Sequence, residues 1–136
     1  MAAIAVNTTS RCQMIDVTAQ VRAAVRKSGV KSGVCLCFVP HTTAAVTLNE
    51  NADPTVPEDI LAGLERMAPA DAGYAHSEGN SDADAHLKSS LVGCQIRVFV
   101  EKGELVLGTW QGVWFCEFDG PRSRKMYVKV AADAVP

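Results

Sequence analysis

Three histidines are the side chains of this 136-residue chain best suited to binding a metal ion. His41 follows an apolar run and Pro40, His76 lies in a polar stretch, and His86 comes two residues after Asp84. Neutral imidazoles are common metal ligands, and neighbouring carboxylates can orient them. The His76–His86 spacing is typical of no particular metal, and a solvated surface position is the alternative for each ring. Because all three lie at the ends of expected elements, we predict that they converge on a divalent metal, Mg²⁺ or Zn²⁺.

A second polar group occupies the stretch LNENADP at 48–54. Its two amides and two carboxylates cannot all pack in a core. Asn49 and Asn51 could hydrogen-bond a substrate, and Glu50 could act as a general acid or base. A loop with Asx turns before a helix is the alternative interpretation, and composition does not choose between the two.

The third candidate is GNSDAD at 79–84, together with the residue before it. Backbone N–H groups at a helix start can bind an anion, and Asn80 could assist. The acids at 82 and 84 would repel a bare phosphate but would accept one that arrives with Mg²⁺. Glu78 and Asp84 are therefore candidate catalytic carboxylates, with a well-capped helix as the alternative.

A fourth set lies in the C-terminal part, in GTWQG at 108–112 and EFDGPRSRK at 117–125. Trp110 could stack on a heteroaromatic ring and Gln111 could hydrogen-bond it, although a Trp in a strand is more often a core residue. Arginine side chains bind phosphate through two parallel hydrogen bonds, although arginines in a turn are commonly just solvated. The cations that could neutralise a pyrophosphate are Lys88, Arg122 and Arg124.

These residues need a scaffold, and the hydrophobic periodicity predicts one of the α+β class. Helices are expected over 18–29, 57–68 and 81–93, with Thr18 as an N-cap, Gly29 as a terminator and a Ser81–Asp84 capping box. From residue 94 the pattern changes to period two, which indicates an antiparallel meander. We expect two or three helices and a largely antiparallel, barrel-like sheet of about seven strands, at 11–18, 33–40, 42–50, 94–100, 104–108, 112–119 and 125–130.

Length and composition restrict the classes of protein to consider. The length suggests one domain, 1–136. A net charge of −2 gives no basic footprint for nucleic acid, so no nucleic-acid partner is expected. No apolar run approaches the ~20 residues that span a bilayer, and no signal peptide is evident, so we expect a cytoplasmic protein without a membrane partner. The five cysteines are expected to be small buried residues.

Three long motifs resemble the YjbQ-like family, also called secondary thiamine-phosphate synthases. They are HTTAAVTLNENADP, YAHSEGNSDADAHLKSSLVG and LGTWQGVWFCEFDGPRSRK, and the resemblance extends over residues 10–130. It implies a compact α+β fold with a barrel-like sheet and a homotrimer. It also implies a polar pocket near a subunit boundary, in which histidines hold a metal or an anion.

The family motifs fall on the candidate residues one by one. The family's H-T-T falls on 41–43, its N-E-N on 49–51, its G-T-W-Q on 108–111 and its D-G-P-R on 119–122. Its H-x-E-G-N-x-D-x-H pattern is met with two extra residues before the second histidine. Asp84 has the usual place relative to His86 and Asp82 relative to Asn80, so either could be the functional acid.

The resemblance implies that a pyrimidine methyl pyrophosphate and a thiazole phosphate join to form thiamine phosphate, with loss of pyrophosphate. The residues above could serve that reaction, with a metal and cations neutralising the leaving group. They would equally serve a metal-dependent hydrolase of a small phosphorylated substrate, with Glu50 or Glu78 as base. A trimer that binds a metal or metabolite without turnover is the third possibility.

Overall fold

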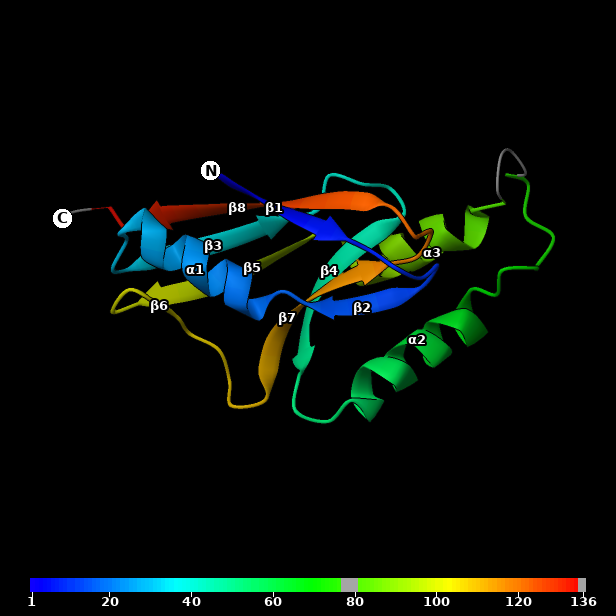
Figure 1. Ribbon diagram of the computed structural model, residues 1–136, viewed down its shortest axis with the longest axis horizontal. Coiled ribbons are helices and arrows are strands. Elements are labelled where there is room, and N and C mark those ends of the chain that lie inside the picture. Colours follow the sequence, from blue (N-terminus) through cyan, green and yellow to red (C-terminus); the bar gives the residue numbers. More distant parts are fainter. Residues whose placement is uncertain (77–80, 135–136) are drawn as a thin grey trace.

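The computed structural model describes residues 1–76 and 81–134 and contains two antiparallel sheets with three helices (Figure 1). The five-stranded sheet has the order β1-β8-β3-β5-β6, and the three-stranded sheet has the order β2-β7-β4. No helix in this part of the chain is long and apolar enough to span a membrane. The strands are β1 (Ala2–Asn7), β2 (Gln13–Asp16), β3 (Gly33–Phe38), β4 (Ala44–Glu50), β5 (Gln95–Glu101), β6 (Glu104–Leu105), β7 (Gln111–Glu117) and β8 (Ser123–Ala132).

The predicted α+β class with a curled antiparallel sheet is confirmed, but the predicted C-terminal meander is wrong. Only β5 and β6 pair in sequence order, whereas β7 lies between β2 and β4 in the second sheet and β8 lies between β1 and β3. The strand β1, which pairs with β8, was not predicted. Thr18 is not the N-cap of its helix: it is the first helical residue, and Asp16 accepts hydrogen bonds from its backbone N–H and its hydroxyl. Gly29 does end the helix, with a φ of 72°, a value that glycine adopts without a Cβ penalty.

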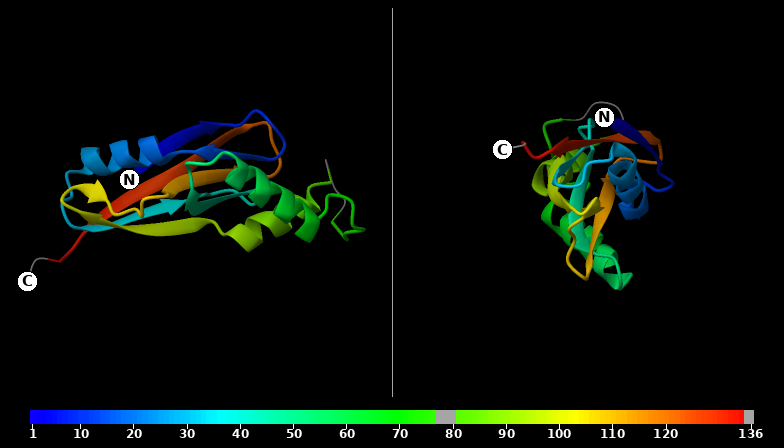
Figure 2. Two further views of the ribbon diagram at one scale, coloured as in Figure 1. Left: turned by 90° about the horizontal axis from the view of Figure 1, so that it is seen from below. Right: turned by 90° about the vertical axis from the view of Figure 1, so that its left-hand side faces the viewer.

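The helices lie at opposite ends of an elongated molecule (Figures 1 and 2). Helix α1 (Thr18–Ser28) lies at one end, whereas α2 (Thr55–Met67) and α3 (Ala83–Val92) lie at the other. The predicted Ser81–Asp84 capping box is absent, because the N-cap of α3 is Asp82 and no side chain caps the helix.

The central strand of the three-stranded sheet, β7, is buried on both faces, and its successive side chains point to opposite sides. Val113 and Phe115 of β7 face the main core, while Cys116 and the following Phe118 face α2 and α3. The main core joins the two sheets and α1, with buried members that include Val21, Val25, Cys35, Cys37, Ala44, Val46, Val98, Val100, Met126 and Val128.

The packing of α3 against β4 brings the first motif beside the third. The hydroxyl of Ser89 donates to the carbonyl of Thr42, and the backbone N–H of Val46 donates to the carbonyl of Gly93. Residues 41–43 and α3 therefore meet at the start of β4, although more than forty positions separate them in the chain.

Candidate metal centre

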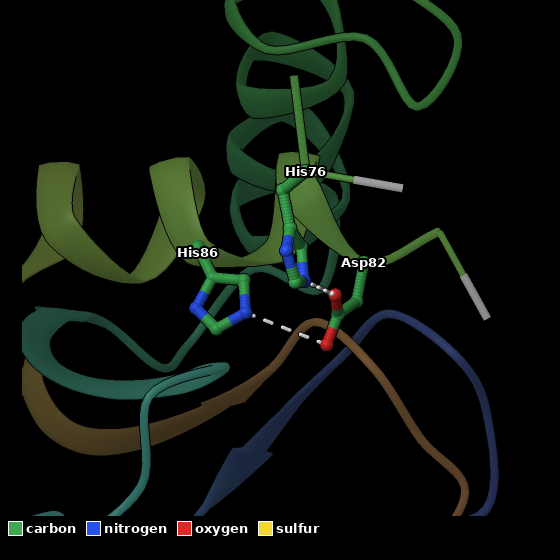
Figure 3. Close-up of side chains that lie close together, drawn as sticks. All are labelled: His76, Asp82 and His86. Carbon is green, nitrogen blue, oxygen red and sulfur yellow. Dashed lines mark hydrogen bonds and ion pairs between the residues drawn. The ribbon is translucent and has the colours of Figure 1, made fainter. Parts of the chain in front are cut away.

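Two of the three histidines meet at a carboxylate, and that carboxylate is Asp82 (Figure 3). Nε2 of His76 lies 2.9 Å from Oδ1 of Asp82, and Nε2 of His86 lies 3.4 Å from Oδ2. One ligand atom from each of the three residues lies within 4.8 Å of the others. The two imidazoles contact edge to face, with ring centroids 5.3 Å apart. This is a group of three candidate ligands around one point.

The start of α3 fixes two of these ligands. Asp82 is the N-cap, and His86 lies one helical turn later, so that both side chains project on the same side of the helix. The backbone N–H of His86 donates to the carbonyl of Asp82, which closes that first turn. His76 precedes residues 77–80 and reaches the carboxylate from outside the helix.

The distances suit a tetrahedral ion. Ligands bound to Zn²⁺ at ~2.1 Å in a tetrahedron are about 3.4 Å apart, so only small shifts would bring these three atoms around an ion. The side chains of His76 and His86 are 45% and 41% exposed, which leaves one side of the group open to solvent and ligand. Catalytic zinc sites have this composition: three protein ligands and one open position.

His41 is not in this group of ligand atoms, although it lies nearby. Its Nε2 accepts a hydrogen bond of 3.0 Å from the backbone N–H of Lys125. Burial lowers the pKa of His41, and the neighbouring Arg124 lowers it further, which favours the neutral ring.

His41 and His86 are joined by a cavity of about 490 Å³. The cavity runs between the start of β4 and one face of α3, and its other lining residues are Thr42, Ala44, Ser89, Ser90, Gly93 and Cys94. Cys94 is exposed here, contrary to the expectation that the cysteines are buried; Cys35, Cys37 and Cys116 do lie in the core. His86 thus borders the cavity that contains His41 and is also part of the group with His76 and Asp82.

Asp84 faces away from the candidate ligands and into a buried ionic cluster. Arg11 donates two hydrogen bonds to its carboxylate, at 3.1 and 2.9 Å, and Lys88 donates a third at 2.7 Å. Lys88 also donates to Glu65 of α2. Burial acts to raise the pKa of Asp84, but the hydrogen bonds from Arg11 and Lys88 outweigh it and hold the pKa at about 2. Asp84 and Lys88, predicted as a catalytic acid and a substrate ligand, are therefore placed where they join α3 to α2 and to the 8–12 loop.

The two C-terminal arginines are also paired with acids. Arg124 is buried, donates to the fully buried Glu117 of β7 through Nε and Nη2, and reaches the hydroxyl of Thr43 at 2.7 Å. Burial acts to raise the pKa of Glu117, but hydrogen bonds from Arg124 and Thr8 outweigh it, so the pKa lies below its ordinary value. Arg122 binds the carboxylate of Asp119, and its side chain is 45% exposed.

The remaining candidates lie at the far end of β4. Six residue steps separate Ala44 from Glu50, which at ~3.3 Å per residue is about 20 Å. Asn49 pairs with Gly112 and Glu50 with Gln111, and the backbone N–H of Asn51 donates to the carbonyl of Trp110. These residues form a second polar cluster, away from the histidines of the same chain.

Side chains of this second cluster form hydrogen bonds within the protein. Asn51 donates to the Asp16 carboxylate, and the Gln111 side chain accepts from the backbone N–H of Gly108. A Cβ on Gly112 would come within 2.5 Å of Nδ2 of Asn51, which accounts for the second glycine of GTWQG. Trp110 is 62% exposed and is not a core residue.

Two predicted residues, Glu78 and Asn80, lie outside the described residues. Sequence reasoning left Asp82 and Asp84 as alternatives and did not find Arg11, Glu65 or Glu117. The i,i+4 spacing of Asp82 and His86 on one helix was a signal that favoured Asp82. Nothing local marked Arg11, because its partner lies 73 positions away.

The sequence and the fold both have counterparts among known proteins. Residues 2–133 match the family described as UPF0047 protein YjbQ-like. The chain belongs to this family. Among its YjbQ-like relatives, a UPF0047 protein of Methanocaldococcus jannaschii is 48% identical over 94% of this chain and 91% of its own. The UPF0047 protein YugU of Bacillus subtilis is 49% identical over 92% of this chain and 94% of its own.

Solved structures of YjbQ-like proteins agree with the fold. A family member from Clostridium acetobutylicum, described as uncharacterised, superposes with a TM-score of 0.92 at 48% identity, covering 96% of this chain and 100% of its own. A protein of unknown function from Sulfolobus solfataricus gives a TM-score of 0.93 at 36% identity, covering 97% of this chain and 96% of its own. The structural similarity to YjbQ-like proteins therefore extends over nearly the whole chain. The names of these relatives state no reaction.

Proposed function

We propose that this chain is a divalent-metal-dependent enzyme that acts on a small phosphorylated substrate. The observation that carries the proposal is the convergence of His76, Asp82 and His86, with their ligand atoms within 4.8 Å, beside a cavity of about 490 Å³. A structural metal site has a closed set of four ligands, whereas the group found among the described residues has three, and its two imidazoles are 45% and 41% exposed.

Zinc, rather than magnesium, is the ion that these residues favour. Two imidazole nitrogens and one carboxylate are typical ligands of Zn²⁺, whereas Mg²⁺ prefers oxygen ligands in octahedral geometry. A divalent ion held here would polarise a phosphoryl oxygen and activate water. The protein's own contribution is to fix Asp82 and His86 on one turn of α3 and to anchor that helix through the buried cluster of Asp84 and Lys88.

Among reactions on a phosphorylated substrate, hydrolysis is the one that the geometry of a single chain supports best. The cations expected to neutralise a departing pyrophosphate are engaged by acids: Lys88 by Asp84 and Glu65, Arg122 by Asp119, and Arg124 by Glu117. The metal would have to neutralise most of the phosphate charge by itself. Hydrolysis of a phosphoester requires only the metal, a water molecule and a bound phosphate.

Thiamine phosphate formation is the second candidate, and the resemblance to the family is what favours it. Trp110, the expected platform for the pyrimidine ring, is exposed but lies at the far end of β4. It could stack on a substrate at the histidines only if a neighbouring subunit supplied it. This reaction is therefore tied to the proposed homotrimer.

Self-association has a suitable surface on the outer face of the five-stranded sheet. Alternate residues of β3 point outward, and they include Val34, Leu36 and Phe38. In the neighbouring β5, Phe99 lies opposite Val34 and is 69% exposed, while Phe38 is 41% exposed. An uncovered apolar face of this kind commonly marks a protein–protein interface.

The experiment compares the purified chain, stripped of metal and then loaded with Zn²⁺ or Mg²⁺, in two assays. One follows phosphate release from a panel of phosphorylated metabolites, and the other follows thiamine phosphate formation from its two phosphorylated halves. His86→Ala is the test variant. Gln20→Ala, on the exposed side of α1 at the opposite end of the molecule, is the control for purification and folding.

Metal-dependent phosphate release that His86→Ala loses and Gln20→Ala retains would support hydrolysis. Thiamine phosphate formation with the same pattern would support the transferase. Zinc binding without turnover of any substrate would instead support a non-enzymatic metal- or metabolite-binding protein. Equal activity in both variants would show that the histidine site is not the catalytic site.

A further inference from the structure

The ring of His41 is held in a fixed position at the end of a strand ladder. β3 pairs with β8 as far as Phe38, which lies opposite Tyr127. Two residues beyond that point, the backbone N–H of Lys125 donates to Nε2 of His41 at 3.0 Å. Because the donor belongs to the main chain, it cannot change its role when protons move.

This hydrogen bond selects the tautomer of the ring. A neutral imidazole has one nitrogen that accepts and one that carries a proton, and Nε2 is the acceptor here. Nδ1 must therefore carry the proton. In this arrangement neither nitrogen offers a free lone pair to a metal: Nε2 is occupied by Lys125, and Nδ1 is protonated.

The same ring lines the cavity that reaches His86. Two of the hydroxyls in that cavity are already used, because Ser89 donates to the carbonyl of Thr42 and Ser90 donates to the carbonyl of His86. Each hydroxyl has one proton to donate, so neither serine can donate to a ligand while these hydrogen bonds hold. His41 is thus a neutral donor beside the candidate metal ligands.

We propose that His41 donates a hydrogen bond from Nδ1–H to an anionic oxygen of the bound ligand, a phosphate monoester or an analogous oxyanion, and is not a fourth metal ligand. The inference deepens the proposed function, since the ligand's phosphate would lie between the metal group and His41.

The tautomer is measured first, by ¹⁵N NMR of the imidazoles in the metal-free wild-type protein at pH 7.5. The His41 signals are assigned by their loss in His41→Gln. We expect Nδ1 to be protonated and Nε2 unprotonated. A ring protonated on Nε2 would overturn the inference, and this result does not depend on any activity.

Binding is measured next by calorimetry, with zinc alone and then with inorganic phosphate added to the zinc-loaded protein. His86→Gln should weaken zinc binding by at least about 100-fold, because loss of even an outer-shell partner costs 10–100-fold. His41→Gln should leave zinc affinity near the wild-type value but weaken phosphate binding by about tenfold or more, as expected for loss of a hydrogen bond to a charged group. His41→Asn, whose amide nitrogen can take the place of Nδ1, should recover part of the phosphate affinity.

The outcomes separate this inference from the proposed function. Equal loss of zinc affinity in His41→Gln and His86→Gln would make His41 a ligand and overturn the inference. Unchanged phosphate affinity in His41→Gln would overturn it as well, as would a wild-type protein that binds no phosphate. If the wild type binds no zinc, the proposed function fails, while phosphate binding by the metal-free variants still tests the role of His41.

Discussion

Replacing Lys88 with methionine should destabilise the protein far more than removing its exposed partner. Lys88 is 1% exposed and lies 2.7 Å from Asp84, which is fully buried. Removing one member of a buried ion pair leaves the other charged and desolvated, at a cost of about 3–5 kcal/mol. Arg11 still donates two hydrogen bonds to Asp84 in the variant, so we expect the lower end, about 3 kcal/mol.

Glu65→Gln is the matched control, because it removes the other acid bound to the same lysine. The side chain of Glu65 is 50% exposed, and an exposed ion pair contributes about 0–1 kcal/mol. The assay is urea unfolding at one protein concentration, followed by the fluorescence of the tryptophans, of which Trp114 is nearly buried. Equal protein concentration matters because the stability of an oligomer depends on it.

The reasoning would be refuted if Lys88→Met and Glu65→Gln lowered the free energy of unfolding equally. That result would mean that the buried cluster holds α3 no more firmly than a surface pair does. A cost near 3 kcal/mol for Lys88 and below 1 kcal/mol for Glu65 would support the structural role of the cluster.

Three further predictions concern charge and association. Arg124→Met should cost about 3–5 kcal/mol in urea unfolding, because it leaves Glu117 buried and unpaired; a loss under 1 kcal/mol would contradict this. Asp84, whose pKa is lowered to about 2, contributes stability that is present above its unfolded pKa of 3.8 and is lost as the pH falls toward 2. That contribution is about 2 kcal/mol, so unfolding from pH 5 to pH 2 should show a steeper loss in the wild type than in Asp84→Asn, and equal slopes would count against it. Phe99→Glu should convert the proposed homotrimer to smaller species in sedimentation velocity, and an unchanged distribution would exclude this face as the interface.

The fold was largely predictable because its strands and helices follow clear hydrophobic periods. The helix over Thr55–Met67 has its apolar stripe and acidic first turn, and β5 and β8 show the two-residue alternation of half-buried strands. The order in which the C-terminal strands pair was not predictable from that alternation, because β7 joins the second sheet and β8 lies between β1 and β3. The strand Ala2–Asn7 was missed because its small residues give little periodic signal, and it forms by pairing with β8. The local sequence pattern does not predict a strand there, and the segment becomes one because it pairs with β8.

The candidate site was predictable in its residue types but not in their roles. The polar motifs do form clusters in the structure. The partners that their charged side chains bind, however, come from distant parts of the sequence. Arg11 reaches Asp84, Arg124 reaches Glu117, and the main chain of Lys125 reaches His41. The first two contacts place Asp84 and Arg124 in ion pairs, and the third fixes the ring of His41 by a backbone hydrogen bond. Sequence spacing gives no signal for any of the three, because the partners lie far apart in the chain. Only the pair of Asp82 and His86 had a local signal, its i,i+4 spacing on one helix.

The most direct test of the proposed metal centre is the zinc affinity of two variants, in which the substituted aspartates lie two positions apart in the chain. Calorimetry of the metal-free protein should give about one Zn²⁺ per chain. Asp82→Asn should weaken binding by at least about 100-fold, because it removes a ligand. Asp84→Asn, studied under conditions where circular dichroism shows it folded, should bind zinc nearly as the wild type does. Loss of affinity in Asp84→Asn with wild-type affinity in Asp82→Asn would contradict the metal centre proposed for this chain.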